Sequence, residues 1–180
     1  MNDRIYNQGA DRLRSEERIK RLEIDKVVDL CIQDKIIKTI LDIGTGTGLF
    51  AEAFNKNSII VSGIDINEKL MDSAKLFLPE SEFRVAPAEN IPYENNSFDA
   101  TFFGLVFHEV SDYKKSLEES YRVSLYQTFI LEWKYITEDF GPPIEHRLKE
   151  EFIKEIAFSV GYKSIENFLL TNLILYKIKK

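Results

Sequence analysis

The chain has 180 residues, of which 44% are hydrophobic and 30% are charged, and its formal net charge at pH 7 is −6. This length favours a single domain, and no run approaches the roughly 20 apolar residues of a membrane span. The acidic balance argues against nucleic acid as a partner, because nucleic-acid binders usually present a basic face. The tail residues Lys177, Lys179 and Lys180 are basic but few, and we expect them to be solvated.

The cysteine and histidine residues indicate which cellular compartment to expect and whether a metal site is expected. Cys31 is the only cysteine and cannot form an internal disulfide, and the first residues lack the apolar run of a signal peptide, so a cytoplasmic location is expected. The apolar pattern around Cys31 predicts a buried core thiol. The histidines His108 and His146 have no Cys or Asp partner at metal-ligand spacing, so no metal site is expected.

The hydrophobic pattern predicts strands and helices in alternation. Residues 11–36 predict one or two amphipathic helices. Strands are then expected over residues 38–43, 58–64, 81–86, 100–106 and 128–133, with helices starting near Leu49, Asn67, Asp112 and Leu148. Gly161 is expected to end the last helix, and residues 164–178 predict two strands joined near residues 171 and 172.

This order of elements predicts the fold class. Alternating strands and helices favour a parallel sheet with helices on both faces, and the final pair of strands favours an antiparallel hairpin. We therefore expect an α/β, three-layer, Rossmann-like sandwich with a mostly parallel seven-stranded sheet. The chain is expected to be one domain, with residues 1–37 as a helical lid or cap and residues 38–180 as the core.

A glycine-rich turn follows the first expected strand. Residues 41–48 read LDIGTGTG, so glycines stand at every second position before a helix. Glycine lets the backbone turn sharply and approach a ligand closely, and the helix start offers N–H groups to an anionic group. The dinucleotide fingerprint would require another glycine where this chain has Leu49. A nicotinamide cofactor is therefore disfavoured.

An acidic residue ends the second expected strand. Asp65 lies 21 residues after Gly44, and a carboxylate at this place can accept hydrogen bonds from both hydroxyls of a ribose. The alternative is that Asp65 caps the next helix or is a solvated loop acid.

Taken together, these motifs resemble those of class I S-adenosylmethionine-dependent methyltransferases, in the small-molecule branch related to the ubiquinone/menaquinone C-methyltransferases. The resemblance runs from about Tyr6 to Gly161 and includes residues 88–99, the segment VFHEV at 106–110, and Arg122 with Val123. It implies S-adenosylmethionine as cofactor and methyl transfer as activity. The residues expected to bind the cofactor are Asp42, Gly44, Thr45, Gly46, Gly48, Asp65, Ile66, Ala88, Glu89 and Leu105.

Two positions depart from the family pattern. Pro87 stands where the family often has an acid that binds the adenine amino group, so Glu89 or the N–H of Ala88 is expected to hold adenine instead. The turn that usually precedes the fifth strand is replaced by Ser-Leu-Tyr-Gln at residues 124–127.

The acceptor is expected to be a small molecule, and the residues around it are less clearly marked. Methyl transfer mainly requires that donor and acceptor be held in line, and a base is needed only if the acceptor must lose a proton. His108 is the candidate base. Tyr6, His108, Trp133 and His146 are candidates for acceptor binding. Two alternatives stay open: a nicotinamide-dependent oxidoreductase, and a protein that binds S-adenosylmethionine without catalysis.

Overall fold

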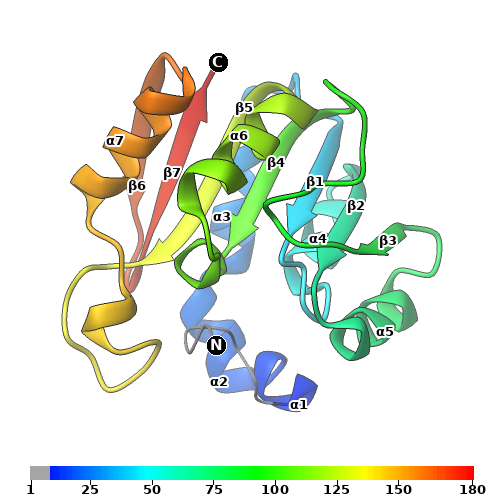
Figure 1. Cartoon of the computed structure of the whole chain (residues 1–180). Helices are drawn as coiled ribbons and strands as arrows, with labels where there is room; N and C mark the ends of the chain where they lie inside the picture. Colours follow the sequence, from blue (N-terminus) through cyan, green and yellow to red (C-terminus); the bar gives the residue numbers. More distant parts are fainter. Residues whose placement is uncertain (1–8) are drawn as a thin grey trace.

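The computed structural model describes residues 9–180 and has one seven-stranded sheet in the order β3-β2-β1-β4-β5-β7-β6 (Figure 1). The strands are β1 (Thr39–Ile43), β2 (Ile60–Asp65), β3 (Glu82–Val85), β4 (Phe98–Gly104), β5 (Ser124–Trp133), β6 (Ser164–Leu169) and β7 (Leu173–Lys179). The helices are α1 (Ala10–Leu13), α2 (Glu16–Leu22), α3 (Ile24–Ile32), α4 (Leu49–Lys56), α5 (Glu68–Phe77), α6 (Tyr113–Val123) and α7 (Glu150–Val160), with short 3₁₀ turns η1 (Phe107–Glu109) and η2 (Ile144–His146).

The topology confirms the predicted doubly wound sheet. Strands β3, β2, β1, β4 and β5 pair in parallel, whereas β7 pairs antiparallel with both β5 and β6. The C-terminal hairpin therefore enters the sheet with its second strand on the inside. The strand order reverses between the neighbours β1 and β4, and ligands of open α/β sheets bind at the carboxyl ends of the strands at such a reversal.

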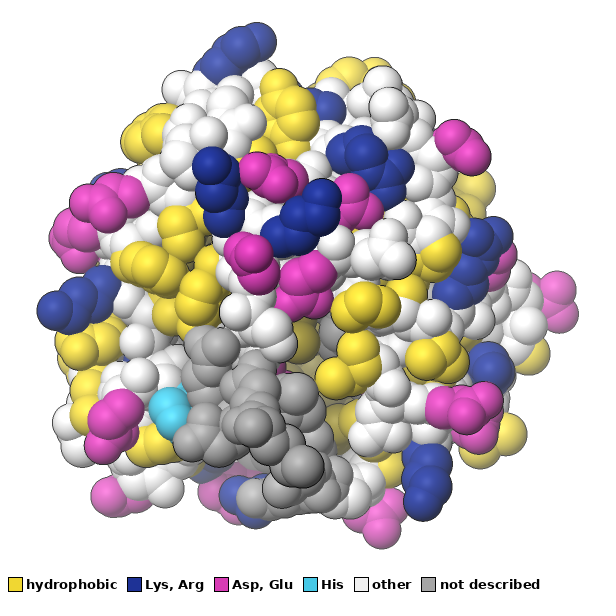
Figure 2. Space-filling view, viewed as in Figure 1, with side chains coloured by type: hydrophobic (Ala, Val, Ile, Leu, Met, Phe, Trp, Pro, Cys, Tyr) yellow, Lys and Arg dark blue, Asp and Glu magenta, His cyan; other side chains and the backbone are white. Residues whose placement is uncertain are grey.

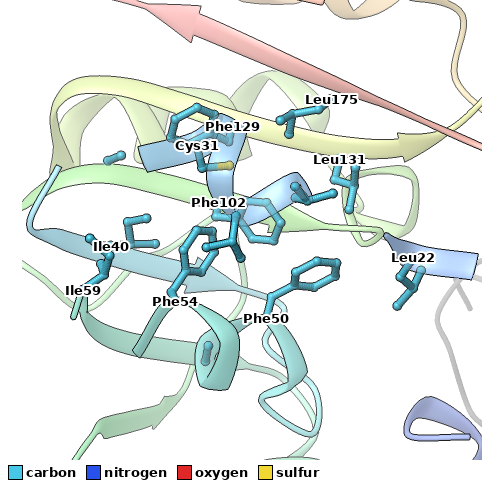
Figure 3. Packing of buried hydrophobic residues seen from close by; sticks show 14 of the residues in the cluster. Leu22, Cys31, Ile40, Phe50, Phe54, Ile59, Phe102, Phe129, Leu131 and Leu175 are labelled. Atoms are coloured by element: carbon cyan, nitrogen blue, oxygen red, sulfur yellow. The ribbon is translucent and has the colours of Figure 1, made fainter. Parts of the chain in front are cut away.

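Two hydrophobic layers cover the faces of the sheet. Helices α3 and α4 pack on one face, where Phe50 and Phe54 lie against Phe102 with ring centroids 5.0 and 5.1 Å apart (Figure 3). Helices α6 and α7 pack on the other face, against a second cluster of buried residues. Cys31 lies fully buried in the first layer, as predicted, and burial raises the pKa of its thiol.

The predicted helix boundaries follow from local hydrogen bonds. The side chains of Asn67 and Asp112 accept the N–H groups of Leu70 and Lys115, and so begin α5 and α6. Gly161 ends α7 in the left-handed region, at φ 114°. These caps confirm the expected starts and stops.

The N-terminal region forms three helices where one or two were expected. Ser15 accepts the N–H of Arg18 and begins α2. Glu23 then adopts a left-handed conformation, with φ 48°, and separates α2 from α3. The buried residues Val27 and Val28 make α3 part of the sheet-covering layer.

The expectation of a solvated basic tail is wrong for Lys177. This residue belongs to the inner strand β7, is 1% exposed, and forms an ion pair with Asp34. Lys180 donates to the carbonyl oxygens of Tyr121 and Ser124 at 2.7 and 2.6 Å. The tail is therefore engaged in the fold.

On the face shown in Figure 2, acidic and basic side chains are interspersed over the described residues. Among residues 9–180, no helix combines the length and apolar character that crossing a membrane requires.

Candidate functional site

A cavity of about 900 Å³ opens where the strand order reverses. Its walls come from the β1–α4 turn, the ends of β2 and β4, the segment 86–89, the N-terminal helices α1 and α2, and the loop after β5. This volume lies within the range of about 300–1,000 Å³ that is typical of small-molecule sites. The described residues thus place most of the predicted site residues around one space.

The glycine-rich turn is held by backbone hydrogen bonds to the neighbouring strand. The N–H groups of Gly44 and Thr45 both donate to the carbonyl of Ile64, at 2.8 and 2.9 Å. Thr45 also donates its hydroxyl to Asp42 at 2.7 Å. Asp42 is 2% exposed, and burial raises its pKa to about 7. Asp42 therefore supports the turn from beneath, while it also lines the cavity.

The three glycines of the turn have different physical roles. A Cβ on Gly44 would come within 2.4 Å of Val106, and one on Gly48 within 2.9 Å of Ala74, so neighbouring elements exclude side chains there. A Cβ on Gly46 would meet only Leu13, at 3.5 Å, and Gly46 lines the cavity at φ +55°. The structure thus gives Gly48 a packing role outside the cavity wall. Gly46 is the bare position that a ligand can approach.

Asp65 points at the glycine turn. One carboxylate oxygen accepts the N–H of Gly46 and the other accepts the N–H of Asn67, both at 2.8 Å. Burial raises the pKa of Asp65, against hydrogen bonds from the backbone that lower it. Each carboxylate oxygen can accept more than one hydrogen bond. The two oxygens can therefore hold the turn and still accept hydroxyl groups from a ligand.

The remaining predicted cofactor residues lie on two sides of the cavity. Ile66 is 53% exposed, and both it and the half-buried Ala88 line the wall. Glu89 also lines the wall, and its carboxylate accepts the N–H groups of Ser111 and Asp112 at 2.7 and 3.1 Å. Glu89 thus anchors the start of α6. Its predicted contact with adenine stays a prediction.

Leu105 closes the cavity below the end of β4. It is 6% exposed and adopts a left-handed backbone with φ +61°. Its N–H donates to Leu131 of β5 at 2.9 Å, which holds the backbone in this costly conformation. A strained non-glycine residue in a cavity wall is typical of functional sites.

Helices α1 and α2 lie over the glycine turn and complete the wall. Arg14 connects them to it, because its guanidinium donates to the carbonyl of Thr47 at 2.7 Å and to Glu52 at 2.8 Å. The same group stacks on the ring of Phe77, 3.5 Å from the centroid. Tyr6, predicted to contact the acceptor, lies outside the described residues.

The three other predicted acceptor residues all line the cavity. His108 is 4% exposed in η1, and Trp133 is 4% exposed at the end of β5. His146, in η2, is half-buried. The loop between β5 and η2 is fixed by Arg147, which donates to the carbonyls of Lys134, Phe140 and Pro142 and to the carboxylate of Glu138.

His108 forms a buried side-chain pair with Glu132. Its Nδ1 lies 2.8 and 3.0 Å from the two carboxylate oxygens of Glu132, which is 1% exposed. The backbone N–H of His108 also donates to Glu132 at 3.0 Å. Within residues 9–180, no group of three or more His, Cys, Asp or Glu side chains is arranged to hold a metal ion.

The contacts that connect distant segments could not be predicted from the sequence. Glu132 stands 24 residues from His108, and Arg14 stands 33 residues from Thr47. Neither separation matches a helix or strand period, so the sequence pattern held no signal for these pairs. The run of carbonyls around Arg147 likewise depends on the path of an irregular loop.

Comparison with known proteins agrees with this geometry. Residues 41–125 match the model of a methyltransferase domain family. The chain is 30% identical over 127 residues to a demethylmenaquinone methyltransferase of Thermotoga maritima, and 30% identical over 172 residues to a ubiquinone/menaquinone biosynthesis C-methyltransferase of Rickettsia akari. These matches cover 67% and 89% of this chain, but only 55% and 62% of the relatives' lengths.

Solved structures extend the agreement over nearly the whole chain. A methyltransferase from Aquifex aeolicus, described as S-adenosylmethionine-dependent, superposes with a TM-score of 0.82 at 26% identity, covering 94% of this chain and 96% of that one. The magnesium protoporphyrin IX methyltransferase of Synechocystis PCC 6803, solved with bound S-adenosylhomocysteine, has the same fold, with a TM-score of 0.70 at 14% identity, covering 91% of this chain and 84% of that one. The chain thus contains a class I S-adenosylmethionine-dependent methyltransferase domain that resembles the ubiquinone/menaquinone C-methyltransferases.

Proposed function

We propose that this chain binds S-adenosylmethionine in the cavity beside the glycine turn and transfers its methyl group to a small-molecule acceptor. The proposal depends mainly on one observation, which is that Gly46 lies directly beside the carboxylate of Asp65. Gly46 has no side chain to fill the cavity, and a carboxylate oxygen of Asp65 accepts the backbone N–H of Gly46 at 2.8 Å. Such a site suits an adenosyl group with its ribose on the carboxylate.

The charge of the site also fits this cofactor. Asp42 is buried and Asp65 is half-buried at the cavity wall, and desolvation raises the pKa of each carboxyl. A ligand that brings a sulfonium and an ammonium group favours the ionised carboxylates, because opposite charges in a poorly solvated place attract strongly. We propose that residues 44–46 face the cofactor and that Ala88, Glu89 and Leu105 enclose it, since all of them line the cavity.

The chain's own residues have several tasks in this reaction. When bound, S-adenosylmethionine supplies a methyl group on a sulfonium whose sulfur leaves as a neutral thioether. The cavity wall orients the acceptor toward that methyl group and keeps water out, which can lower the barrier by roughly 7–11 kcal/mol. We propose that His108, Trp133 and His146 contact the acceptor, with His108 as the candidate base, and that α1 and α2 form the part of the lid that covers the cofactor.

The nature of the acceptor comes from the relatives' names alone. Demethylmenaquinone is the first compound to test, because a relative is named for it. We place the protein in the cytoplasm. The nicotinamide-dependent alternative finds no support in the site, because Leu49 begins α4 where the dinucleotide fingerprint needs glycine.

Replacement of Gly46 by valine tests the proposal. The valine side chain would project into the cavity, so we expect binding of S-adenosylhomocysteine, measured by calorimetry, to weaken by at least 100-fold. The left-handed backbone of Gly46 adds a stability cost of about 1–2 kcal/mol, which thermal unfolding measures separately.

Gly161→Val is the matched control. Gly161 also has a positive φ and open space around a Cβ, but it lies at the end of α7 and does not line the cavity. We expect this variant to lose stability and to keep its affinity. Normal binding by the Gly46 variant would show that the cofactor lies elsewhere, and no binding by the unsubstituted chain at high micromolar concentration would overturn the proposed function. A methylated product from any acceptor would eliminate the non-catalytic alternative.

A further inference from the structure

His108 and Glu132 form a buried pair that is held by several hydrogen bonds. The carboxylate of Glu132 receives three donors: the ring Nδ1 of His108, the backbone N–H of His108 at 3.0 Å, and the backbone N–H of Trp133 at 3.3 Å. Glu132 is 1% exposed and His108 is 4% exposed. A buried carboxylate costs free energy unless hydrogen bonds stabilise it, so this arrangement is built to hold the ionised form.

The same arrangement fixes the protonation pattern of the imidazole. An ionised carboxylate can only accept hydrogen bonds, so Nδ1 must carry the proton and donate it. In the neutral ring the other nitrogen, Nε2, then holds the lone pair. His108 lines the cavity next to Trp133 and His146, on the side of the site where the acceptor is expected.

We propose that Glu132 is a positioning residue that sets His108 as a proton acceptor through Nε2. The proposal rests on the proposed methyl transfer and deepens it. It assigns Glu132 a role through His108 alone, because its oxygens are occupied by that ring and by two backbone N–H groups. Because the backbone N–H of His108 also donates to Glu132, this carboxylate is bonded to both the ring and the main chain of His108, where η1 meets the end of β5.

This role defines a class of acceptor. A built base is useful only when the nucleophile arrives protonated, so the acceptor carries an acidic O–H, N–H or activated C–H group. Its proton passes to Nε2, and His108 becomes an imidazolium whose charge Glu132 balances. The electron pair left on the acceptor atom forms the new bond to the methyl carbon, while the pair of the broken carbon–sulfur bond stays on sulfur.

Several charged or titratable groups lie near His108. Glu132 approaches from β5, and Glu109 of η1 lies 3.7 Å from Nε2. The hydroxyl of Tyr113 in α6 lies 3.4 Å from the backbone oxygen of His108. His146 from η2, with Arg18 and Arg21 from α2, lines the same cavity. Of the carboxylates, Glu132 makes the shorter contact with the ring.

Nitrogen-15 NMR of the histidine rings tests the proposal without an acceptor. The chain has two histidines, so a His146→Gln variant assigns both sets of signals. We expect the neutral ring of His108 to carry its proton on Nδ1. In Glu132→Gln we expect the titration midpoint of His108 to fall by about 1–2 pH units, because an adjacent opposite charge favours the imidazolium, and we expect the tautomer preference to weaken.

Glu109→Gln is the comparison variant. It removes a carboxylate near the other ring nitrogen, so we expect the Nδ1–H tautomer to persist. A proton on Nε2 of the unsubstituted protein would overturn the proposal even if the Glu132 variant failed to fold. An unchanged midpoint and tautomer in a folded Glu132→Gln protein would also overturn it. Calorimetry with S-adenosylhomocysteine on the unsubstituted chain tests the proposed function separately, so the two failures are distinguishable.

Discussion

Replacement of Asp42 by asparagine should make the stability of the protein less dependent on pH. Asp42 is 2% exposed beneath the glycine turn, and burial, aided by the charge of Asp65, raises its pKa to about 7 from an ordinary value of 3.8. Asparagine has nearly the same shape and keeps an oxygen that can accept the hydroxyl of Thr45. The substitution therefore removes the titrating charge and changes little else.

The sign of the effect follows from proton binding. Between about pH 4 and pH 7 the folded state holds the Asp42 proton while the unfolded state has released it, so the free energy of unfolding falls as pH rises through this window. A pKa that moves from 3.8 to about 7 corresponds to a loss of about 4 kcal/mol above pH 7. Asp42→Asn avoids this loss, so it should be more stable than the unsubstituted protein at pH 8.

Urea denaturation at several pH values measures the difference between the two proteins. We expect the difference in unfolding free energy to be small at pH 4 and to grow to about 4 kcal/mol by pH 8. Asp72→Asn is the matched control, because the side chain of Asp72 is 68% exposed on α5, and its difference should stay flat. A constant difference for Asp42→Asn across this range would refute the claim that Asp42 is protonated in the fold.

Two further substitutions probe the site and the core. Asp65→Ala should weaken binding of S-adenosylhomocysteine by about 1.5–3 kcal/mol, the scale of hydrogen bonds to a charged group, whereas Asp72→Ala should not; equal calorimetric affinities for both variants would remove Asp65 from the site. Asp34→Ala leaves the buried ammonium of Lys177 without its partner and should cost about 3–5 kcal/mol in urea denaturation. Adding Lys177→Met should restore most of that loss, and no recovery would show that the ion pair is not its source.

The sequence predicted the sheet well because its signals are local. Short apolar runs and the side-chain caps at Asn67 and Asp112 depend on residues a few positions apart, and both caps appear in the structure where they were expected. The N-terminal region was harder to predict. Its split into three helices depends on a left-handed backbone at Glu23, which is a conformation that a glutamate pattern does not announce.

The basic tail is a second region whose structure could not be predicted from its local sequence. A short run with three lysines is typical of a solvated end, but pairing of β7 between β5 and β6 turns Lys177 inward. Strand order is a property of the whole sheet, so the sequence of the tail alone could not predict it. The burial is tolerated because Asp34, two residues after the end of α3, supplies the opposite charge.

The part of the cavity proposed to bind the cofactor was easier to predict from the sequence than the part proposed to bind the acceptor. Gly46 follows β1 and Asp65 ends the neighbouring strand β2, so their meeting is dictated by the parallel sheet and could be predicted from spacing alone. His108 meets Glu132 because β4 and β5 are neighbours and η1 turns back over the end of β5. A turn of that kind is set by packing and by hydrogen bonds to buried groups, which leave no periodic trace in the sequence. Acceptor chemistry in this fold is therefore determined by irregular segments on a regular frame, and variants of Glu132 will report on it more directly than variants of the glycine turn.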